Sequence, residues 1–235
     1  EQHEPHVRSL CLAAAVGLAA IHCGGGGAPD TGPQPIAAVA GLKTMEILRR
    51  PGAYERIRAN GYAVNILINN VGIGKGGTFW SMPLKDIQHM MMLNNKVMVE
   101  MTYHFLPELQ RYPESYILSL SSLEARLPLP YKAIYTGTKN FVYAFSLAIA
   151  QELKFTGVKV SVVCPGPVVT NAEGLARMNA HGGRSKLLMM YPEQVARIAV
   201  EGMLKGKQVI VPGFLNTLFF RIGSLLPLRI KMSIL

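Results

Sequence analysis

The feature that most constrains the fold is an alternation of short apolar runs and long helical segments, which begins at Val64. The apolar runs predict buried strands over residues 64–68, 115–120, 158–163 and 208–211. Between them, apolar side chains recur at helical spacing over residues 84–109, 133–155 and 192–204. Alternation at this length predicts parallel strands joined by crossover helices. The expected fold is α/β, a three-layer doubly wound parallel sheet.

Residues 1–62 have a different character from the rest of the chain. Glycines 24–27 and the Pro-rich stretch after them predict a linker, and residues 37–50 predict a helix ended by Pro51-Gly52. Residues 10–21 are apolar but shorter than the roughly 20 residues that span a bilayer, so a buried helix is expected. No run of β-branched residues predicts a strand here. We therefore expect an atypical segment over 1–62 and the main domain over 63–235.

Composition excludes several classes of protein. The three cysteines, Cys11, Cys23 and Cys164, show no C-x-x-C spacing, which predicts neither a disulfide framework nor a metal site and fits a reducing, cytoplasmic compartment. The net charge of +10 favours anionic ligands such as phosphorylated cofactors or an acidic membrane surface. The basic residues are scattered and lack interleaved aromatics, so no nucleic-acid partner is expected.

Gly72, Gly74 and Gly77 match the dinucleotide-binding pattern G-x-G-x-x-G directly after a predicted strand. That pattern requires a helix right after the third glycine and an acid about 20 residues further on. The glycines lead instead into Thr-Phe-Trp-Ser-Met-Pro, and no acid lies between Asp86 and Glu100. The match is therefore predicted to be accidental.

A second group of residues points to proton transfer. Tyr135 and Lys139 are spaced i and i+4 at the start of a predicted helix and so share one face. A nearby cation stabilises tyrosinate, which makes a tyrosine a candidate acid or base. Ser122 follows one predicted strand, and the sequence Cys-Pro-Gly-Pro at 164–167 follows the next. Ligands of open α/β sheets bind at these carboxyl ends of strands.

In these motifs the chain resembles the short-chain dehydrogenase/reductase family over about residues 63–213. The resemblance is carried by Asn-Asn-Val-Gly at 69–72, by Asn94, by Ser122 with Tyr-x-x-x-Lys at 135–139, and by Pro-Gly-Pro-Val at 165–168 with Thr170. It implies a Rossmann-like fold and an NAD(P)-dependent oxidoreductase acting on a carbonyl or alcohol. Residues 63–235 would form the catalytic region.

The resemblance also implies a role for each residue. Tyr135 would exchange a proton with the substrate oxygen, Lys139 would lower the pKa of Tyr135 and hold the nicotinamide ribose, and Ser122 would hydrogen-bond the developing alkoxide. Asn94 would anchor a water that relays protons to Lys139. The cofactor-binding residues would be Asn70, Gly72, Tyr135, Lys139, Pro165, Gly166, Val168 and Thr170. Considered singly, Asn94 or Asn95 is also explained as a polar helix position, and Ser122 and Thr170 as capping residues.

The sequence departs from the family at its beginning. It contains no Thr-Gly-x-x-x-Gly-x-Gly, the loop that receives the cofactor pyrophosphate, and the first strands of the sheet are expected to be lacking. Residues 32–61 instead resemble a fragment of glutamate-1-semialdehyde aminotransferase-like enzymes. The alternative is therefore a non-catalytic or vestigial protein that cannot bind the cofactor. A serine hydrolase is disfavoured because no G-x-S-x-G surrounds Ser122, and a pyridoxal-phosphate enzyme because the fragment is too short.

Further expectations concern partners. The cofactor is NAD or NADP, with NADP slightly favoured, and the variable loop at 171–191 suggests an apolar small-molecule substrate. The family resemblance implies a homo-oligomer formed through the helices at 84–109 and 133–155. Residues 214–235 mix bulky apolar side chains with basic ones, so they are expected to touch a membrane surface, to pack on a partner, or to close the core.

Overall fold

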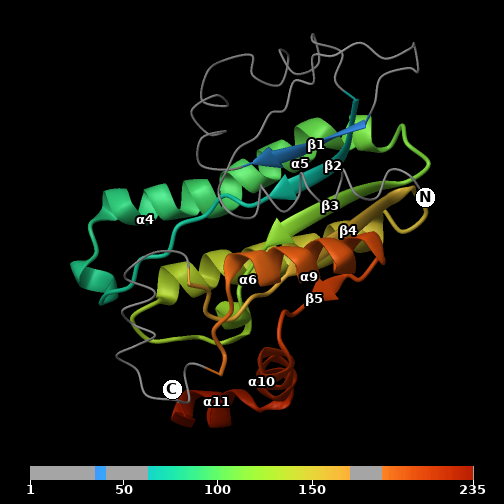
Figure 1. The fold of residues 1–235 in the computed structure, drawn as a ribbon. Helices are drawn as coiled ribbons and strands as arrows, with labels where there is room; N and C mark the ends of the chain where they lie inside the picture. Colours follow the sequence, from blue (N-terminus) through green and yellow to red (C-terminus); the bar gives the residue numbers. More distant parts are fainter. Residues whose placement is uncertain (1–34, 41–62, 170–186, 235) are drawn as a thin grey trace.

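The computed structural model describes residues 35–40, 63–169 and 187–234. Figure 1 shows its elements, which in chain order are β1 (Pro35–Ala40), β2 (Ala63–Asn69), η1 (Phe79–Ser81), α4 (Leu84–Met91), η2 (Met92–Lys96), α5 (Val97–Leu109), β3 (Ser115–Leu120), η3 (Leu123–Arg126), α6 (Ala133–Glu152), β4 (Val158–Val163), α9 (Pro192–Leu204), β5 (Val209–Ile210), α10 (Phe214–Leu225) and α11 (Leu228–Ile234).

The described strands form one parallel sheet in the order β1-β2-β3-β4-β5. Because β2, β3 and β4 each pair in parallel with the next strand along the chain, the connection to that strand must cross over a face of the sheet. The predicted strands at 64–68, 115–120 and 158–163 are confirmed, and the predicted strand at 208–211 is shorter, at 209–210. The predicted doubly wound α/β fold is confirmed.

The strand β1 corrects the expectation for the first part of the chain. The sequence predicts a helix over residues 37–50 and no strand before residue 63, yet Pro35–Ala40 pairs along the length of β2. An Ala-rich segment has little β propensity of its own, so the neighbouring strand decides its conformation. Pro35 lies at the first residue of the strand, a position where its missing N–H is tolerated. The rest of the predicted helix at 37–50 lies outside the described residues.

The predicted helix at 84–109 is interrupted by a π-helical turn, η2, between α4 and α5. Asn94 and Asn95 both lie in this turn. Such turns insert one residue into the helix and are often found at functional sites. The turn redirects the asparagine side chains toward α6, where both make hydrogen bonds.

Two apolar clusters lie between the sheet and the helices that cover its two faces. On one face of the sheet, Leu67 and Ile117 pack in a cluster with Leu93 and Phe105, which belong to the η2–α5 segment. On the other face, Ile68 and Leu118 pack against α9, whose contributing residues are Ala199, Val200 and Met203. The sheet therefore lies between helices on both sides, as Figure 1 shows.

The last two helices, α10 and α11, lie beyond the central layers (Figure 1). Phe220 of α10 packs at the edge of a third cluster that contains Val142, Val162 and Cys164. Helix α10 also contacts η3, the short helix that follows Ser122. Within the part of the chain that the structure describes, no helix has the length and apolar character needed to cross a bilayer.

Candidate active site

The carboxyl ends of three adjacent strands bring the predicted polar residues to one edge of the sheet. Asn70 follows β2, Ser122 follows β3 and Pro165 follows β4. The strands are in register up to this edge, where Asn69 pairs with Ser119. Because parallel strands end on the same side, residues separated by about fifty positions in sequence share one surface of the molecule.

Asn94 connects two segments of this edge. Its side chain, 1% exposed, accepts a hydrogen bond from the Ile73 amide (2.8 Å) and donates to the Ile73 carbonyl (3.0 Å). The same Nδ2 donates to the hydroxyl of Thr138 in α6 (2.9 Å). Both amide hydrogens of Asn94 are therefore used, and one lone pair of Oδ1 is left. Asn94 thus fixes the segment after β2 against the helix that carries Tyr135.

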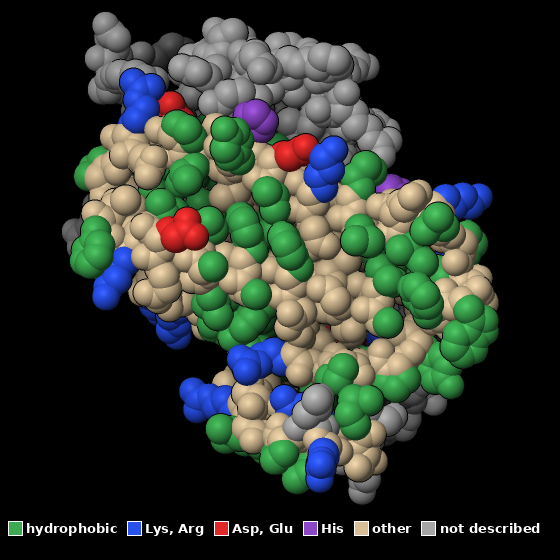
Figure 2. Space-filling view, turned by 180° about the vertical axis from the view of Figure 1, so that it is seen from behind, with side chains coloured by type: hydrophobic (Ala, Val, Ile, Leu, Met, Phe, Trp, Pro, Cys, Tyr) green, Lys and Arg blue, Asp and Glu red, His purple; other side chains and the backbone are tan. Residues whose placement is uncertain are grey.

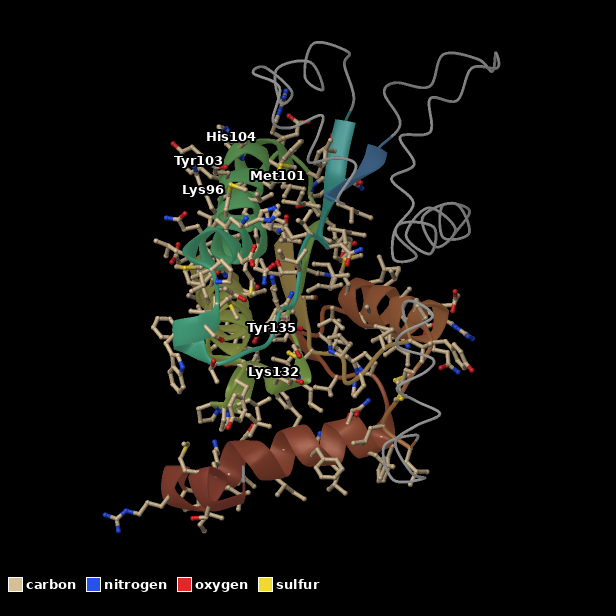
Figure 3. The ribbon with its side chains drawn as sticks, turned by 90° about the vertical axis from the view of Figure 1, so that its left-hand side faces the viewer. Lys96, Met101, Tyr103, His104, Lys132 and Tyr135 are labelled. Carbon is tan, nitrogen blue, oxygen red and sulfur yellow. The ribbon has the colours of Figure 1, made fainter. Side chains whose placement is uncertain are left out.

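Tyr135 and Ser122 meet at the amino-terminal end of α6. The phenol of Tyr135 is hydrogen-bonded with the Ser122 side chain, whose Oγ also accepts from the Glu124 amide (3.1 Å). Thr138 donates to the Tyr135 carbonyl (2.8 Å) and holds the first turn of the helix. Figure 3 shows Tyr135 pointing into the region between α6 and the sheet. The predicted proximity of serine and tyrosine is present in the structure.

Lys139 is one helical turn further along α6 and is buried. Its ammonium donates to the Leu120 carbonyl (2.9 Å), the last residue of β3. Burial lowers the pKa of Lys139 to about 8, and a nearby Cys164 thiol acts in the opposite direction. An amine with this pKa is mainly protonated at neutral pH, and it loses its proton more readily than an exposed lysine.

The electrostatics of Tyr135 differ from the expectation. Burial raises the pKa of the Tyr135 phenol, the hydrogen bond with Ser122 lowers it, and the Glu124 carboxylate raises it, with a net upward shift. The Lys139 nitrogen lies 6.0 Å from the centre of the Tyr135 ring. At this separation the cation does not overcome the burial of the phenol, so the protonated tyrosine is the stable form in this structure.

Two of the three glycines in the G-x-G-x-x-G match, Gly72 and Gly74, pack against the catalytic candidates. A Cβ on Gly72 would lie 3.1 Å from the Lys139 nitrogen, and one on Gly74 would lie 3.1 Å from the Tyr135 ring. Helix α4 begins at Leu84, well after these glycines. This placement agrees with the prediction that the G-x-G-x-x-G match is accidental.

Three predicted cofactor-binding residues line a separate cavity of about 160 Å³ on the α9 side of the sheet. These residues are Asn70, Pro165 and Val168, and the remaining walls are mainly aliphatic side chains of β2, β3 and α9. Gly166, in the same loop, lies against the buried carboxamide of Asn216 from α10. Thr170 lies outside the described residues, as does most of the variable loop at 171–191.

The sequence alone does not identify several of the residues that contribute to this site. Thr138 and Glu124 carry no signal of their own, although Thr138 lies inside the Tyr-x-x-x-Lys motif and Glu124 lies two residues after Ser122. Asn216 is separated from Gly166 by fifty positions, and no local pattern marks it. Ser121 donates to the Lys139 carbonyl (2.7 Å), a role that the neighbouring Ser122 obscures in the sequence.

The observed groups fit the nicotinamide-ribose end of a dinucleotide. Tyr135 and Lys139 supply a phenol and an ammonium that can bond ribose hydroxyls. The fold and this cluster define a doubly wound α/β protein equipped for proton transfer at the carboxyl edge of its sheet.

A family model described as short chain dehydrogenase matches residues 45–180, more than half of the chain. The chain belongs to this family, and the resemblance seen in its motifs is confirmed. The match begins at residue 45, within the stretch that resembles aminotransferase-like enzymes, and the comparisons do not show that second resemblance.

Two characterised relatives illustrate the family. The chain is 34% identical over 105 residues to the ketoacyl reductase HetN of a Nostoc species, covering 45% of this chain and 37% of the relative. It is 30% identical over 185 residues to dehydrogenase/reductase SDR family member 7B of Rattus norvegicus, covering 75% of this chain and 56% of the relative. The chain thus spans about half or less of the length of these relatives.

Solved structures show the same fold. A 7β-hydroxysteroid dehydrogenase superposes with a TM-score of 0.64 at 21% identity, covering 75% of this chain and 69% of that chain. A short-chain dehydrogenase from Sphingobium yanoikuyae in complex with NADPH gives a TM-score of 0.59 at 22% identity, covering 77% and 74%. At these identities the likeness establishes the Rossmann-like architecture.

Proposed function

We propose that this chain is an NAD(P)-dependent oxidoreductase that interconverts a small-molecule carbonyl and the corresponding alcohol. The observation that carries the proposal is the meeting of Ser122, Tyr135 and Lys139 at one edge of the sheet, with Asn94 bonded to the segments around them. Family membership supports the reaction class.

Tyr135 acts as the general acid in the reducing direction. Its raised pKa keeps the phenol protonated, so it can deliver a proton to a carbonyl oxygen that gains negative charge. Ser122, already bonded with the phenol, donates to the same oxygen. In the oxidising direction Tyr135, in its tyrosinate form, accepts the proton of the alcohol, while Ser122 keeps its hydrogen bond to the same oxygen. A bound nicotinamide supplies the hydride chemistry.

Lys139 and Asn94 support the proton donor in different ways. The Lys139 ammonium binds ribose hydroxyls and stabilises the tyrosinate left after proton transfer. Asn94 has one Oδ1 lone pair free for a water beside Lys139, and its other bonds hold Ile73 and Thr138 in place. Asn94 therefore serves mainly to position the segments on either side of Lys139.

The cofactor is NAD or NADP, with NADP slightly favoured because the chain carries a net charge of +10. Asn70, Pro165 and Val168 would contact the cofactor through the strand-end cavity. Gly72, Gly166 and Thr170 complete the proposed binding residues. Relatives of the same fold have been solved with NADPH and with NAD, which supports a nicotinamide cofactor without choosing between the two.

A second candidate function is that of a non-catalytic protein without cofactor binding. It is favoured by the sequence, which contains no Thr-Gly-x-x-x-Gly-x-Gly. In this alternative, residues 1–62 form an atypical segment. The resemblance of residues 32–61 to aminotransferase-like enzymes then concerns only the origin of that segment.

We place the protein in the cytoplasm, with an apolar substrate and with residues 214–235 in contact with a membrane surface.

Self-association is proposed through α4, α5 and α6. The outer surface of these helices exposes aromatic side chains, among them Tyr103 (75%) and Phe141 (43%), which suit contact with a second copy.

Calorimetric titration of the purified chain with NADH and NADPH tests the proposal. Saturable binding that weakens in Lys139→Ala, but not in the exposed-lysine control Lys154→Ala, would support a working cofactor site. Trp80 is 85% exposed, so its quenching is a secondary readout. If the folded protein binds neither nucleotide, the oxidoreductase proposal fails and the non-catalytic alternative stands.

A further inference from the structure

Helices α10 and α11 form the end of the molecule next to the candidate active site. In Figure 3 they extend across the molecule on the side of Lys132 and Tyr135. Figure 2 shows hydrophobic and basic side chains at this end of the visible face, without acidic ones. The composition of this end differs from the mixed charges elsewhere on the molecule.

The two faces of α10 have different surroundings. Asn216 is 2% exposed, and Phe220 packs near the ring of Tyr143 (6.0 Å between centroids), so this face is directed to the body of the protein. The opposite face carries a stripe of large apolar side chains at spacings of four, four and three residues. Their exposed fractions are 83% for Phe214, 44% for Leu218, 46% for Ile222 and 84% for Leu225.

Helix α11 adds Ile230 (45% exposed), whereas Met232 (51% exposed) lines a hollow together with residues of η3 and the start of α6. A contiguous apolar stripe of this kind is costly in water and marks a surface that meets another apolar phase. We name the outer side chains of α10 and α11 the terminal apolar face, defined by Phe214, Leu218, Phe219, Ile222, Leu225 and Ile230.

The charged residues of α10 and α11 are all basic, and the acid Glu201 of α9 lines a hollow beside Arg221. Arg221, Arg229 and Lys231 lie on the same two helices, and the sequence contains no acidic residue after Glu201. Helices with an exposed apolar stripe and basic flanks bind in the plane of an anionic membrane interface. The apolar side chains enter the acyl boundary, and the basic ones remain at the headgroups.

We propose that the terminal apolar face docks on a lipid bilayer that contains anionic headgroups. This inference deepens the membrane contact proposed above, and it does not depend on cofactor binding or catalysis. A second copy of the chain is a poorer occupant. In a two-fold contact of this face with itself, Arg221, Arg229 and Lys231 would meet the same cations without any acid of that segment to neutralise them.

The helix that would contact the bilayer, α10, also packs against the loop after β4 that contains Gly166. Asn216, on the inner side of α10, donates to the carbonyls of Leu188 (3.1 Å) and Pro212 (2.9 Å) and lies against Gly166. The membrane-facing and loop-facing sides therefore belong to one helix. The bilayer would lie beside the active-site edge, where an apolar substrate dissolved in lipid has a short path to the enzyme.

The test is flotation of the full chain with vesicles of phosphatidylcholine alone and with vesicles that also contain phosphatidylserine. We expect binding to the anionic vesicles that weakens at high salt. The double variant Phe214→Ser/Leu225→Ser should lose at least about tenfold in binding, because two highly exposed apolar side chains no longer enter the bilayer. Arg229→Glu should lose more than about fivefold, the effect of one basic residue near the surface.

Matched controls distinguish binding through the terminal apolar face from nonspecific binding of exposed apolar side chains to vesicles. Phe155→Ser removes a side chain that is 94% exposed at the far end of α6, and it should leave vesicle binding unchanged. In a Trp80→Phe background, Phe214→Trp should show a blue shift with anionic vesicles. This measurement reports on the face even if the serine variant folds poorly.

Three results would overturn the inference. The first is no binding to anionic vesicles by a folded chain, and the second is an equal loss of binding in Phe155→Ser. The third is a concentration-dependent dimer that disappears in the Phe214→Ser/Leu225→Ser variant, which would assign the face to a second copy. A failure to bind NADH or NADPH leaves each of these readouts unaffected, so the two proposals fail separately.

Discussion

The carboxamide of Asn216 occupies the space in which a side chain at Gly166 would lie. A Cβ at Gly166 would be 2.5 Å from Asn216 Oδ1, although the two residues belong to different elements. Asn216 cannot easily move away, because its Nδ2 donates to the carbonyls of both Leu188 and Pro212. Oδ1 itself is buried without a hydrogen-bond partner. Close packing, and not polar pairing, therefore holds the strand-end loop against α10.

Gly166→Ala should destabilise the protein by about 1–3 kcal/mol, the usual cost of forcing atoms into a well-packed site. Part of this loss should be recovered in Gly166→Ala/Asn216→Ala, because the second change removes the clashing carboxamide. Urea unfolding of the single and double variants measures the coupling.

The control for this substitution is Gly137→Ala in α6, where a Cβ meets nothing within 4 Å. Alanine is favoured over glycine inside a helix by about 1 kcal/mol, so this variant should be as stable as the parent or more so. Additive effects of Gly166→Ala and Asn216→Ala would contradict the proposed contact.

Asn94→Ala should cost about 2–4 kcal/mol of stability, because it removes the side-chain partner of the Ile73 amide and carbonyl and the hydrogen bond that Thr138 accepts. Asn95→Ala is the matched control in the same π-helical turn. It removes a single hydrogen bond, to the Thr138 carbonyl (2.9 Å), and should cost about 1 kcal/mol. Equal losses in the two variants, measured by chemical unfolding, would show that Asn94 has no special structural role.

The sequence predicts some of these relationships and not others, for physical reasons. Strands β2, β3 and β4 are buried on both faces, so their runs of apolar residues identify them without help from the rest of the chain. Strand β1 has no such signal, since its alanines become a strand only through pairing with β2. The spacing of Tyr135 and Lys139 reveals a shared helix face, but burial at each position decides the pKa, and burial depends on the whole fold.

Distant packing is the second limit on prediction from the sequence. Asn94 is recognisable as a candidate from its motif, but the π-helical turn that orients it follows from contacts with α6. Asn216 becomes visible only when α10 is placed against the loop after β4.

Tyr135→Phe should lower carbonyl reduction by about 10²–10⁴-fold, the usual contribution of a general acid, with little change in stability. Tyr103→Phe, at a side chain that is 75% exposed on α5, is the control and should retain full activity. Turnover is followed by oxidation of NADPH or NADH with a panel of apolar ketones. Full activity of Tyr135→Phe would remove the phenol from the mechanism.

The stability contributed by Lys139 should depend on pH above neutrality. The unfolded chain keeps the lysine proton up to its ordinary pKa of 10.5, whereas the folded chain releases it above about 8. Between these values the unfolded state binds more protons, so the contribution of Lys139 to stability rises with pH. Below pH 8 the cost of burying the cation is present in full.

Comparison with Lys139→Met isolates this effect, because other titrating groups act in both proteins. One of these groups is Cys164, whose pKa is raised to about 12 by burial and whose contribution falls as pH rises above its ordinary value. Above pH 8, the free energy of unfolding of the parent should increase relative to that of Lys139→Met. A difference that stays constant with pH would mean that the lysine is not buried as a cation.

Glu124→Gln should lower the pKa of Tyr135. The Glu124 carboxylate raises the pKa of the phenol, and glutamine keeps the shape while it removes the charge. The backbone amide of residue 124 would still donate to Ser122 (3.1 Å), so the serine keeps its orientation. The ion pair with Lys132 (2.7 Å) would be lost, but partly exposed pairs contribute at most about 1 kcal/mol, so the fold should persist. NMR titration of ring-labelled tyrosine measures the shift, with Glu152→Gln at the far end of α6 as the control. A Tyr135 pKa that is unchanged, or that moves upward, would show that Glu124 does not tune the proton donor.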